Sequence, residues 1–67
     1  MKFYILYNYD NDSNAGYTGK ERIEAETLEI ALQKYNAFKI QLEKMARDIR
    51  MLGLERIDQE EIITKIL

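Results

Sequence analysis

The expected fold follows mainly from one stretch, residues 27–53, which reads TLEIALQKYNAFKIQLEKMARDIRMLG. Thr27 is a typical helix N-cap, Glu29 is an acidic residue in the first turn, and Gly53 stands where a helix would stop. Apolar residues recur with alternating steps of three and four, the spacing of one helical face: Leu28, Ala31, Tyr35, Phe38, Leu42, Met45, Ile49 and Leu52. The pattern predicts one long helix over residues 28–52.

Such a helix is long for a chain of 67 residues. About 25 residues span roughly 38 Å as a helix, whereas a compact chain of this length is only about 28 Å across. No Gly or Pro lies inside the stretch to mark a break, and Asn36 is the nearest candidate. We therefore expect the overhanging end to pack against another subunit, with a break near Asn36 as the alternative.

Two segments before this helix have the pattern of strands. Residues 2–9, KFYILYNY, are rich in aromatic and branched side chains, and residues 20–26, KERIEAE, alternate apolar with charged positions. The two segments predict an antiparallel hairpin. Tyr4 and Leu6 fall on the strand face opposite Phe3 and Ile5, so that both faces of the first strand need cover.

The last segment, residues 54–67, reads LERIDQEEIITKIL. Asp58 with Glu61 three residues on resembles a capping box, which predicts a short helix from about residue 59. Its apolar side chains would fold back on the long helix: Ile62, Ile63, Ile66 and Leu67. The expected architecture is α+β, a single domain over residues 1–67 in the order ββαα.

Composition excludes several classes of site. The chain has no Cys and no His, which removes disulfides, thiolate metal sites and the usual ligands of zinc and iron. The net charge of −2 favours neither a polyanion partner nor a mimic of one. Since no apolar run approaches the length of a bilayer span and no leader is evident, we expect a cytoplasmic protein with no membrane partner and no cofactor.

The loop DNDSNAGYTGKE, residues 10–21, has the oxygen ligands of a calcium-binding EF-hand loop at the usual spacing: Asp10, Asp12, Asn14, Gly16 through its carbonyl, Thr18 and Glu21. Ala15 replaces the glycine of the sharp turn, and a strand rather than a helix leads in. Asp, Asn, Ser and Gly also accumulate in ordinary hairpin loops. We interpret the segment as a polar turn without a bound metal, and calcium binding stays a lesser alternative.

Catalysis is not expected from this chain. Ser13 lacks a base to activate it, and the acidic residues from Glu21 to Glu29 fit a solvated strand and a helix N-terminus. The sequence GYTGK also lacks the spacing of a phosphate-binding loop. No catalytic residue is therefore assigned.

The expected function is protein binding. The helical stripe exceeds what a hairpin and a short helix can cover, which implies association, either through the long helix or by extension of the hairpin sheet. The expected interface residues are Tyr4, Leu6, Tyr35, Phe38, Leu42, Met45 and Ile49. A homodimer that binds another protein as an inhibitor or regulator fits this surface. In size and lack of catalytic groups the chain is comparable to small accessory proteins of phages and mobile elements.

The alternative function is nucleic-acid binding. Four basic residues follow the later part of the expected helix, Lys39, Lys44, Arg47 and Arg50. The acidic residues Glu43 and Asp48 are interleaved with them at the spacing of helical ion pairs, which is typical of an ordinary solvated face.

Overall fold

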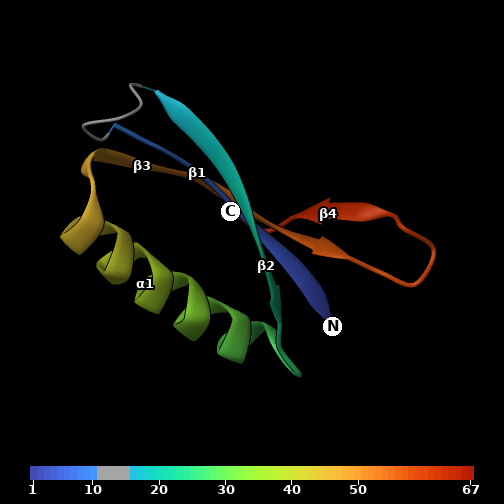
Figure 1. The fold of residues 1–67 in the computed structure, drawn as a ribbon. Helices are drawn as coiled ribbons and strands as arrows, with labels where there is room; N and C mark the ends of the chain where they lie inside the picture. Colours follow the sequence, from blue (N-terminus) through green and yellow to red (C-terminus); the bar gives the residue numbers. More distant parts are fainter. Residues whose placement is uncertain (11–15) are drawn as a thin grey trace.

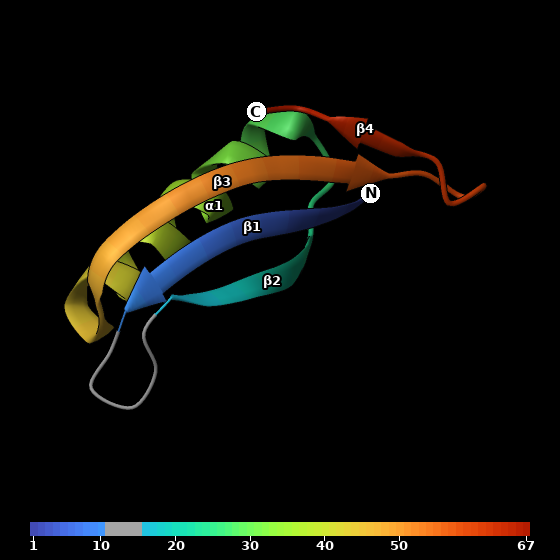
Figure 2. The same cartoon turned by 90° about the horizontal axis from the view of Figure 1, so that it is seen from above.

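The computed structural model describes residues 1–10 and 16–67. Its elements are β1 (Lys2–Asp10), β2 (Tyr17–Glu24), α1 (Leu28–Met45), β3 (Arg47–Ile57) and β4 (Ile63–Lys65). The strands form one antiparallel sheet in the order β2-β1-β3-β4, and α1 lies across one face of it (Figures 1 and 2). Because β1 is antiparallel to both of its neighbours, β2 and β3 run parallel to each other and α1 is the crossover between them.

The N-terminal hairpin is confirmed. β1 pairs with β2 without a register shift from Lys2 opposite Glu24 to Tyr9 opposite Tyr17. Phe3 and Ile5 point towards α1 and are fully buried, so the odd-numbered side chains of β1 form the face that meets the helix.

The prediction of one helix over residues 28–52 is wrong for its C-terminal third. It begins as expected, because Thr27 Oγ1 accepts a hydrogen bond from the amide of Ile30 at 3.2 Å. It ends at Met45: Ala46 has extended backbone, and its N–H donates to the Leu42 carbonyl. Asp48 then has a φ of +52°, a value that residues other than glycine adopt rarely. With 18 residues the helix is about 27 Å long, so no end overhangs the domain.

Residues 47–57 form a strand instead of continuing the helix because the second edge of β1 needs a hydrogen-bonding partner. β3 supplies it, pairing from Lys2 opposite Ile57 to Asp10 opposite Arg47, with β-bulges that shift the register twice. The last two members of the apolar stripe, Ile49 and Leu52, therefore belong to a strand. The free apolar edge of a two-stranded sheet, which would have invited a second subunit, is occupied by the same chain.

The prediction of a short helix from about residue 59 is also wrong. Asp58 does cap backbone amides, since its Oδ1 accepts from the N–H groups of Glu60 and Ile62 at 2.9 Å each. These bonds close a turn between β3 and β4, in which Glu61 has a φ of +62°. The α+β class is confirmed, but within residues 1–10 and 16–67 the order is ββαββ with one helix rather than ββαα.

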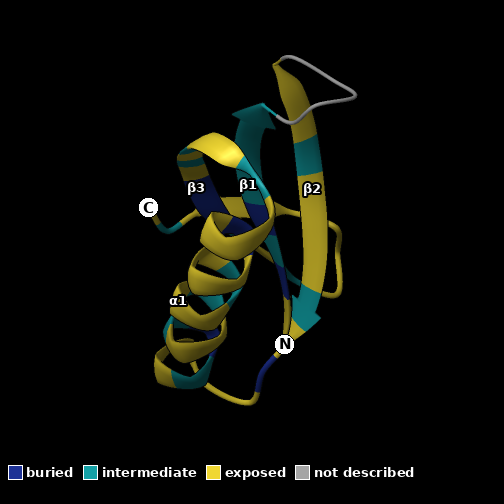
Figure 3. Cartoon of the chain, turned by 60° about the vertical axis from the view of Figure 1, so that its left-hand side comes forward, coloured by how far each residue is buried: buried dark blue, intermediate teal, exposed yellow. Residues whose placement is uncertain are grey.

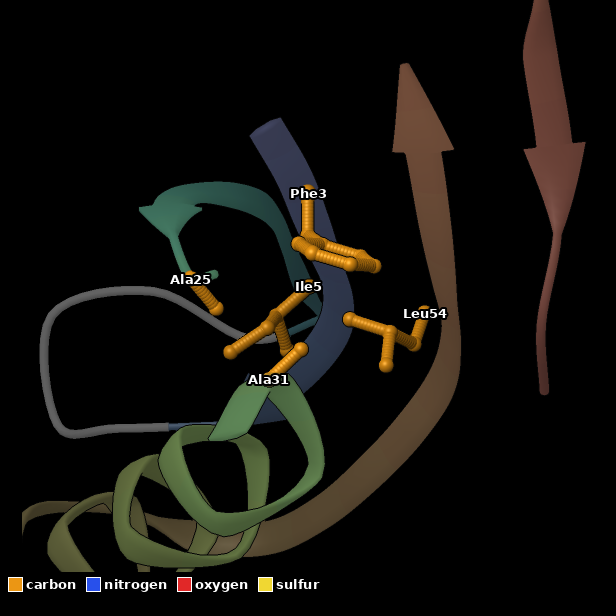
Figure 4. Packing of buried hydrophobic residues seen from close by; sticks show 5 residues of the cluster. All are labelled: Phe3, Ile5, Ala25, Ala31 and Leu54. Carbon is orange, nitrogen blue, oxygen red and sulfur yellow. The ribbon is translucent and has the colours of Figure 1, made fainter. Parts of the chain in front are cut away.

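The core lies between α1 and the sheet near the middle of β1 (Figure 4). It consists of Phe3, Ile5, Ala25, Ala31 and Leu54. Ala31 is fully buried, and its small side chain lets the helix approach the strands closely. The outer side of α1 is exposed along its length (Figure 3).

Candidate protein-binding face

The face of the sheet opposite α1 is called the open face below. Residues paired directly across antiparallel strands share a face, so the register defines its members. One row across the sheet contains Arg22, Tyr4, Glu55 and Lys65; the next contains Glu24, Lys2, Ile57 and Ile63; a third contains Lys20, Leu6 and Gly53. Tyr4, Leu6 and Ile57 are half-buried and Ile63 is exposed. Apolar side chains thus occupy the middle of a mixed polar surface.

The open face is hollowed beside the turn between β3 and β4. A hollow of 460 Å³ has apolar side chains from Tyr4, Ile57 and Ile63, and its charged side chains come from Lys2, Arg22, Asp58 and Glu61, with Gln59 completing the lining. An adjoining hollow of 450 Å³ shares Lys2, Ile57, Asp58 and Gln59 with it. The β3–β4 hairpin projects beyond the start of β1 and away from α1 (Figure 1). This end of the open face is therefore an accessible concave surface that combines apolar and charged groups.

Charge is unevenly distributed over the protein. The register places twice as many basic as acidic side chains on the open face, namely Lys2, Lys20, Arg22, Arg47, Arg50 and Lys65 against Asp10, Glu24 and Glu55. The whole chain, in contrast, has a net charge of −2. The open face is consequently electropositive relative to the rest of the surface.

Local contacts hold some of these side chains in place. Lys20 Nζ lies 4.8 Å from the centroid of the Tyr4 ring, a cation–π distance. Arg22 and Glu24 form an exposed ion pair with an N–O distance of 3.5 Å, which contributes little to stability because water screens it. Asn8 Nδ2 donates to Thr18 Oγ1 at 2.9 Å.

The tyrosines outside this face have a structural role. Tyr7 stacks on Tyr9 at 5.9 Å and meets Phe38 of α1 edge-on at 5.1 Å, and Tyr17 packs against Tyr9 at 5.0 Å. The Tyr7 ring lies over Gly19, where a Cβ atom would come within 2.4 Å of it. Burial raises the pKa of the Tyr7 hydroxyl, and the nearby Tyr17, Glu21 and Tyr9 raise it further. Burial also raises the pKa of Tyr35.

The seven expected interface residues fall into three groups. Tyr4 and Leu6 lie on the open face. Tyr35 and Phe38 pack against the buried core, and Leu42 is buried on the same helix, so α1 uses them within its own chain. Met45 is 70% exposed at the end of α1, and Ile49 is half-buried in β3. Only the first pair belongs to the candidate site.

The expected basic helical face is not formed as one surface. Lys39 and Lys44 lie on α1, whereas Arg47 and Arg50 lie in β3 and share the open face with their β1 partners Asp10 and Asn8. The expected helical pairs of Glu43 with Arg47 and of Lys44 with Asp48 would each span the end of the helix at Met45.

The expected calcium ligands are only partly described. Asp12 and Asn14, together with Ser13, lie outside the described residues. Among the others, Asp10 and Thr18 belong to the open face, while Glu21 pairs with Ile5 on the opposite face. The Asp10 carboxylate accepts a hydrogen bond from the Gly16 amide, which closes the hairpin end. Within residues 1–10 and 16–67, no group of three or more acidic side chains is placed to hold a metal ion.

Ile57 and Ile63 were not expected at an interface. The sequence predicted Ile63 to lie in a helix that is absent, and Ile57 to flank the capping residue Asp58 as a hydrophobic staple with Ile62. Glu55 and Ile57 are two residues apart on the same face, and residues 63–65 read Ile-Thr-Lys, so neither stretch alternates apolar with polar positions and no periodic signal in the sequence places these two side chains.

Comparison of the chain with protein-family models, with curated proteins and with solved structures gives no match. In the described part of the chain no helix is both long and apolar enough to cross a membrane.

Proposed function

We propose that this protein is a non-catalytic interaction module that binds another protein through the open face and acts as an inhibitor or regulator. The observation that supports this function best is the hollow of 460 Å³ with Tyr4, Ile57 and Ile63 among charged side chains. Apolar side chains in a concave surface with a polar rim are the usual anatomy of a protein interface.

The charges on the open face indicate what kind of protein segment would bind there. Among the strand-paired residues of the open face, six are basic and three acidic, and Asp58 and Glu61 of the turn between β3 and β4 add two acidic groups at the hollow. The rim of the hollow has two basic and two acidic side chains, Lys2 and Arg22 with Asp58 and Glu61, so the excess of basic groups lies along the rest of the open face. A partner segment with one or two large apolar side chains in the hollow and acidic residues along the remaining basic part of the face would complement both regions. The occupant that we propose is therefore an acidic segment of a different protein.

Nucleic acid fits this surface less well, although it is basic. Proteins that bind single strands offer several aromatic side chains on which successive bases stack. Tyr4 is the one aromatic residue that the register places on the open face, and Lys20 lies over its ring. The other aromatic side chains belong to the side that faces α1 or to α1 itself.

The test is selection from a random peptide library displayed on phage against the immobilised protein, followed by affinity measurement with synthetic peptides. We expect the enriched peptides to combine acidic with large apolar residues. A fluorescein-labelled oligothymidine, titrated at low and high salt, is the parallel probe for nucleic acid.

Two matched variants locate the binding surface. Leu6→Glu places a negative charge on the open face and should weaken the selected peptides by about tenfold or more. Ile40→Glu makes the same change at a side chain of α1 that is 55% exposed, and should leave the affinity unchanged. Peptides whose affinity changes neither in Leu6→Glu nor in Tyr4→Glu, which alters the lining of the hollow itself, would place the site elsewhere. Tight, salt-dependent oligothymidine binding without peptide enrichment would replace the proposed partner with a nucleic acid.

A further inference from the structure

The hydrogen bonds at the ends of the sheet show which backbone groups point outwards from its two edges. Met1 and Ala25 exchange both of their backbone hydrogen bonds, at 2.9 and 3.0 Å. Hydrogen-bonded and non-hydrogen-bonded pairs alternate along an antiparallel ladder. The outward-facing residues of β2 are therefore Thr18, Lys20, Arg22 and Glu24.

The β2 edge is protected against a further strand. Each of its outward-facing residues is polar or charged, a usual way to prevent edge-to-edge pairing. The outward carbonyl of Glu24 already accepts a hydrogen bond from Lys34 Nζ of α1 at 2.6 Å. Pairing with a second β2 about Glu21 would also set Lys20 against Arg22 and Glu21 against its own copy.

The β4 edge has the opposite character. Ile66 N donates to the Leu54 carbonyl at 2.7 Å, and Asp58 N donates to the Ile62 carbonyl at 3.2 Å. By the same alternation, the N–H and C=O groups of Ile63 and Lys65 point away from β3. The three residues of β4, Ile63, Thr64 and Lys65, are all exposed, and exposed apolar side chains flank them on both sides: Ile62 is 55% and Leu67 48% accessible, and Ile63 itself is 54% accessible.

From these observations we propose that β4 pairs with β4 of a second copy of this chain, antiparallel and centred on Thr64. In this register Ile63 of each copy lies opposite Lys65 of the other, so that the outward-facing groups of both strands form hydrogen bonds. The two Thr64 side chains face each other, a favourable cross-strand pair. Centring on Lys65 would oppose two lysines, and centring on Ile63 would bring in Glu61, whose φ of +62° is not that of a strand.

Such a dimer has one continuous sheet of eight strands, twice the four of a single chain, with both helices on the same side. The two open faces become neighbours on the other side. The inference goes beyond the proposed function and does not depend on it, because the edge uses backbone groups of β4 whereas the proposed partner lies over the side chains of the open face.

The first experiment is sedimentation velocity over a wide range of protein concentrations, with two matched proline variants. Lys65→Pro and Lys20→Pro each remove one outward-facing N–H and one lysine charge, at opposite edges of the sheet. We expect a concentration-dependent dimer that Lys65→Pro abolishes and Lys20→Pro leaves intact. A parent protein that stays monomeric at every concentration overturns the proposal, as does a dimer that only Lys20→Pro dissociates.

Charge changes at residue 63 test the register and remain informative if Lys65→Pro does not fold. Ile63→Lys places a lysine opposite Lys65 of the other copy at two positions of the dimer, and should weaken the dimer by about 2- to 30-fold. Ile63→Glu places a glutamate there instead and should tighten the dimer by a similar factor. Centring on Ile63 would make Ile63→Glu weaken the dimer instead, which would contradict the register proposed. Folding of each variant is checked by circular dichroism.

Amide hydrogen exchange locates the interface residue by residue. The N–H groups of Ile63 and Lys65 should exchange fast at low concentration and slowly at high concentration, while those of Lys20 and Arg22 stay fast throughout. The Leu6→Glu variant, designed to lose peptide binding, should dimerise normally. Protection at Lys20 and Arg22 with none at Ile63 would refute pairing through β4.

Discussion

The two edges of this sheet differ in how they are built. β2 pairs along its whole length with β1, its outward-facing residues are polar, and Lys34 covers the carbonyl of Glu24. β4 pairs through only three residues, Ile63, Thr64 and Lys65, and exposed apolar side chains flank it at Ile62 and Leu67. Since an exposed strand edge is a template for another strand, we expect association, as proposed above, at the β4 edge and not at the β2 edge.

The largest expected effect comes from Leu54, which joins the β4 side to the core. Its side chain is fully buried, and its carbonyl accepts hydrogen bonds from Ile66 and Leu67 at 2.7 and 3.2 Å. Leu54→Ala should lower the free energy of unfolding by about 2 to 5 kcal/mol through the cavity it leaves, as urea denaturation would measure. Leu52→Ala, at a side chain that is 50% exposed, is the control and should cost less than about 1 kcal/mol. Equal losses for the two variants would contradict the assignment of the core.

A smaller loss is expected from Gly19 on the β2 side. A Cβ atom there would come within 2.4 Å of the Tyr7 ring, which is held between Tyr9 and Phe38. Gly19→Ala should therefore destabilise the fold by about 1 to 3 kcal/mol, measured as a shift of the urea midpoint. In a Tyr7→Ala background the same substitution should cost much less, and strictly additive losses would show that the ring is not the obstacle. Dimerisation through β4 should be unaffected.

Lys34 tests whether the β2 edge is protected. Lys34→Met removes the hydrogen bond to the Glu24 carbonyl and should change the free energy of unfolding by less than about 1 kcal/mol, because the contact is exposed. It should, however, allow association at the second edge and produce species larger than a dimer in light scattering. Lys39→Met removes an exposed lysine from the same helix and should not. If Lys34→Met assembles like the parent protein, the charged side chains of β2 are sufficient to protect this edge without Lys34.

The smallest effect concerns alkaline pH. Burial raises the pKa of Tyr7 and Tyr35 above their ordinary value of 10.0. A group whose pKa is higher in the folded than in the unfolded state stabilises the fold fully below the unfolded value, and this stability is lost as pH rises through the folded value. The melting temperature should thus fall above about pH 10, and less steeply in Tyr7→Phe and Tyr35→Phe. A fall of the same slope in these variants would assign the alkaline loss to other groups.

The expectations from sequence succeeded where the pattern was local. The aromatic and branched residues of 2–9 and the period of two in 20–26 predicted the hairpin, and Thr27 marked the start of the helix. Of the proposed site, Tyr4 and Leu6 were found from their position on the second face of the first strand. The hollow was not predicted. Ile57 and Ile63 line it only because β3 and β4 form a hairpin, whereas the capping-box pattern of Asp58 and Glu61 led us to expect a helix there.

Short stretches of sequence were thus sufficient to predict the hairpin and the N-terminus of α1, and composition alone excluded sites built on cysteine or histidine. They were not sufficient for the end of α1 or for β3, because the apolar steps of three and four continue past Met45 without a Gly or Pro. Those residues became a strand because the free edge of β1 offers backbone hydrogen bonds to a segment distant in sequence, with Lys2 opposite Ile57. A pairing of that kind depends on the whole chain, and a short window of sequence does not contain it.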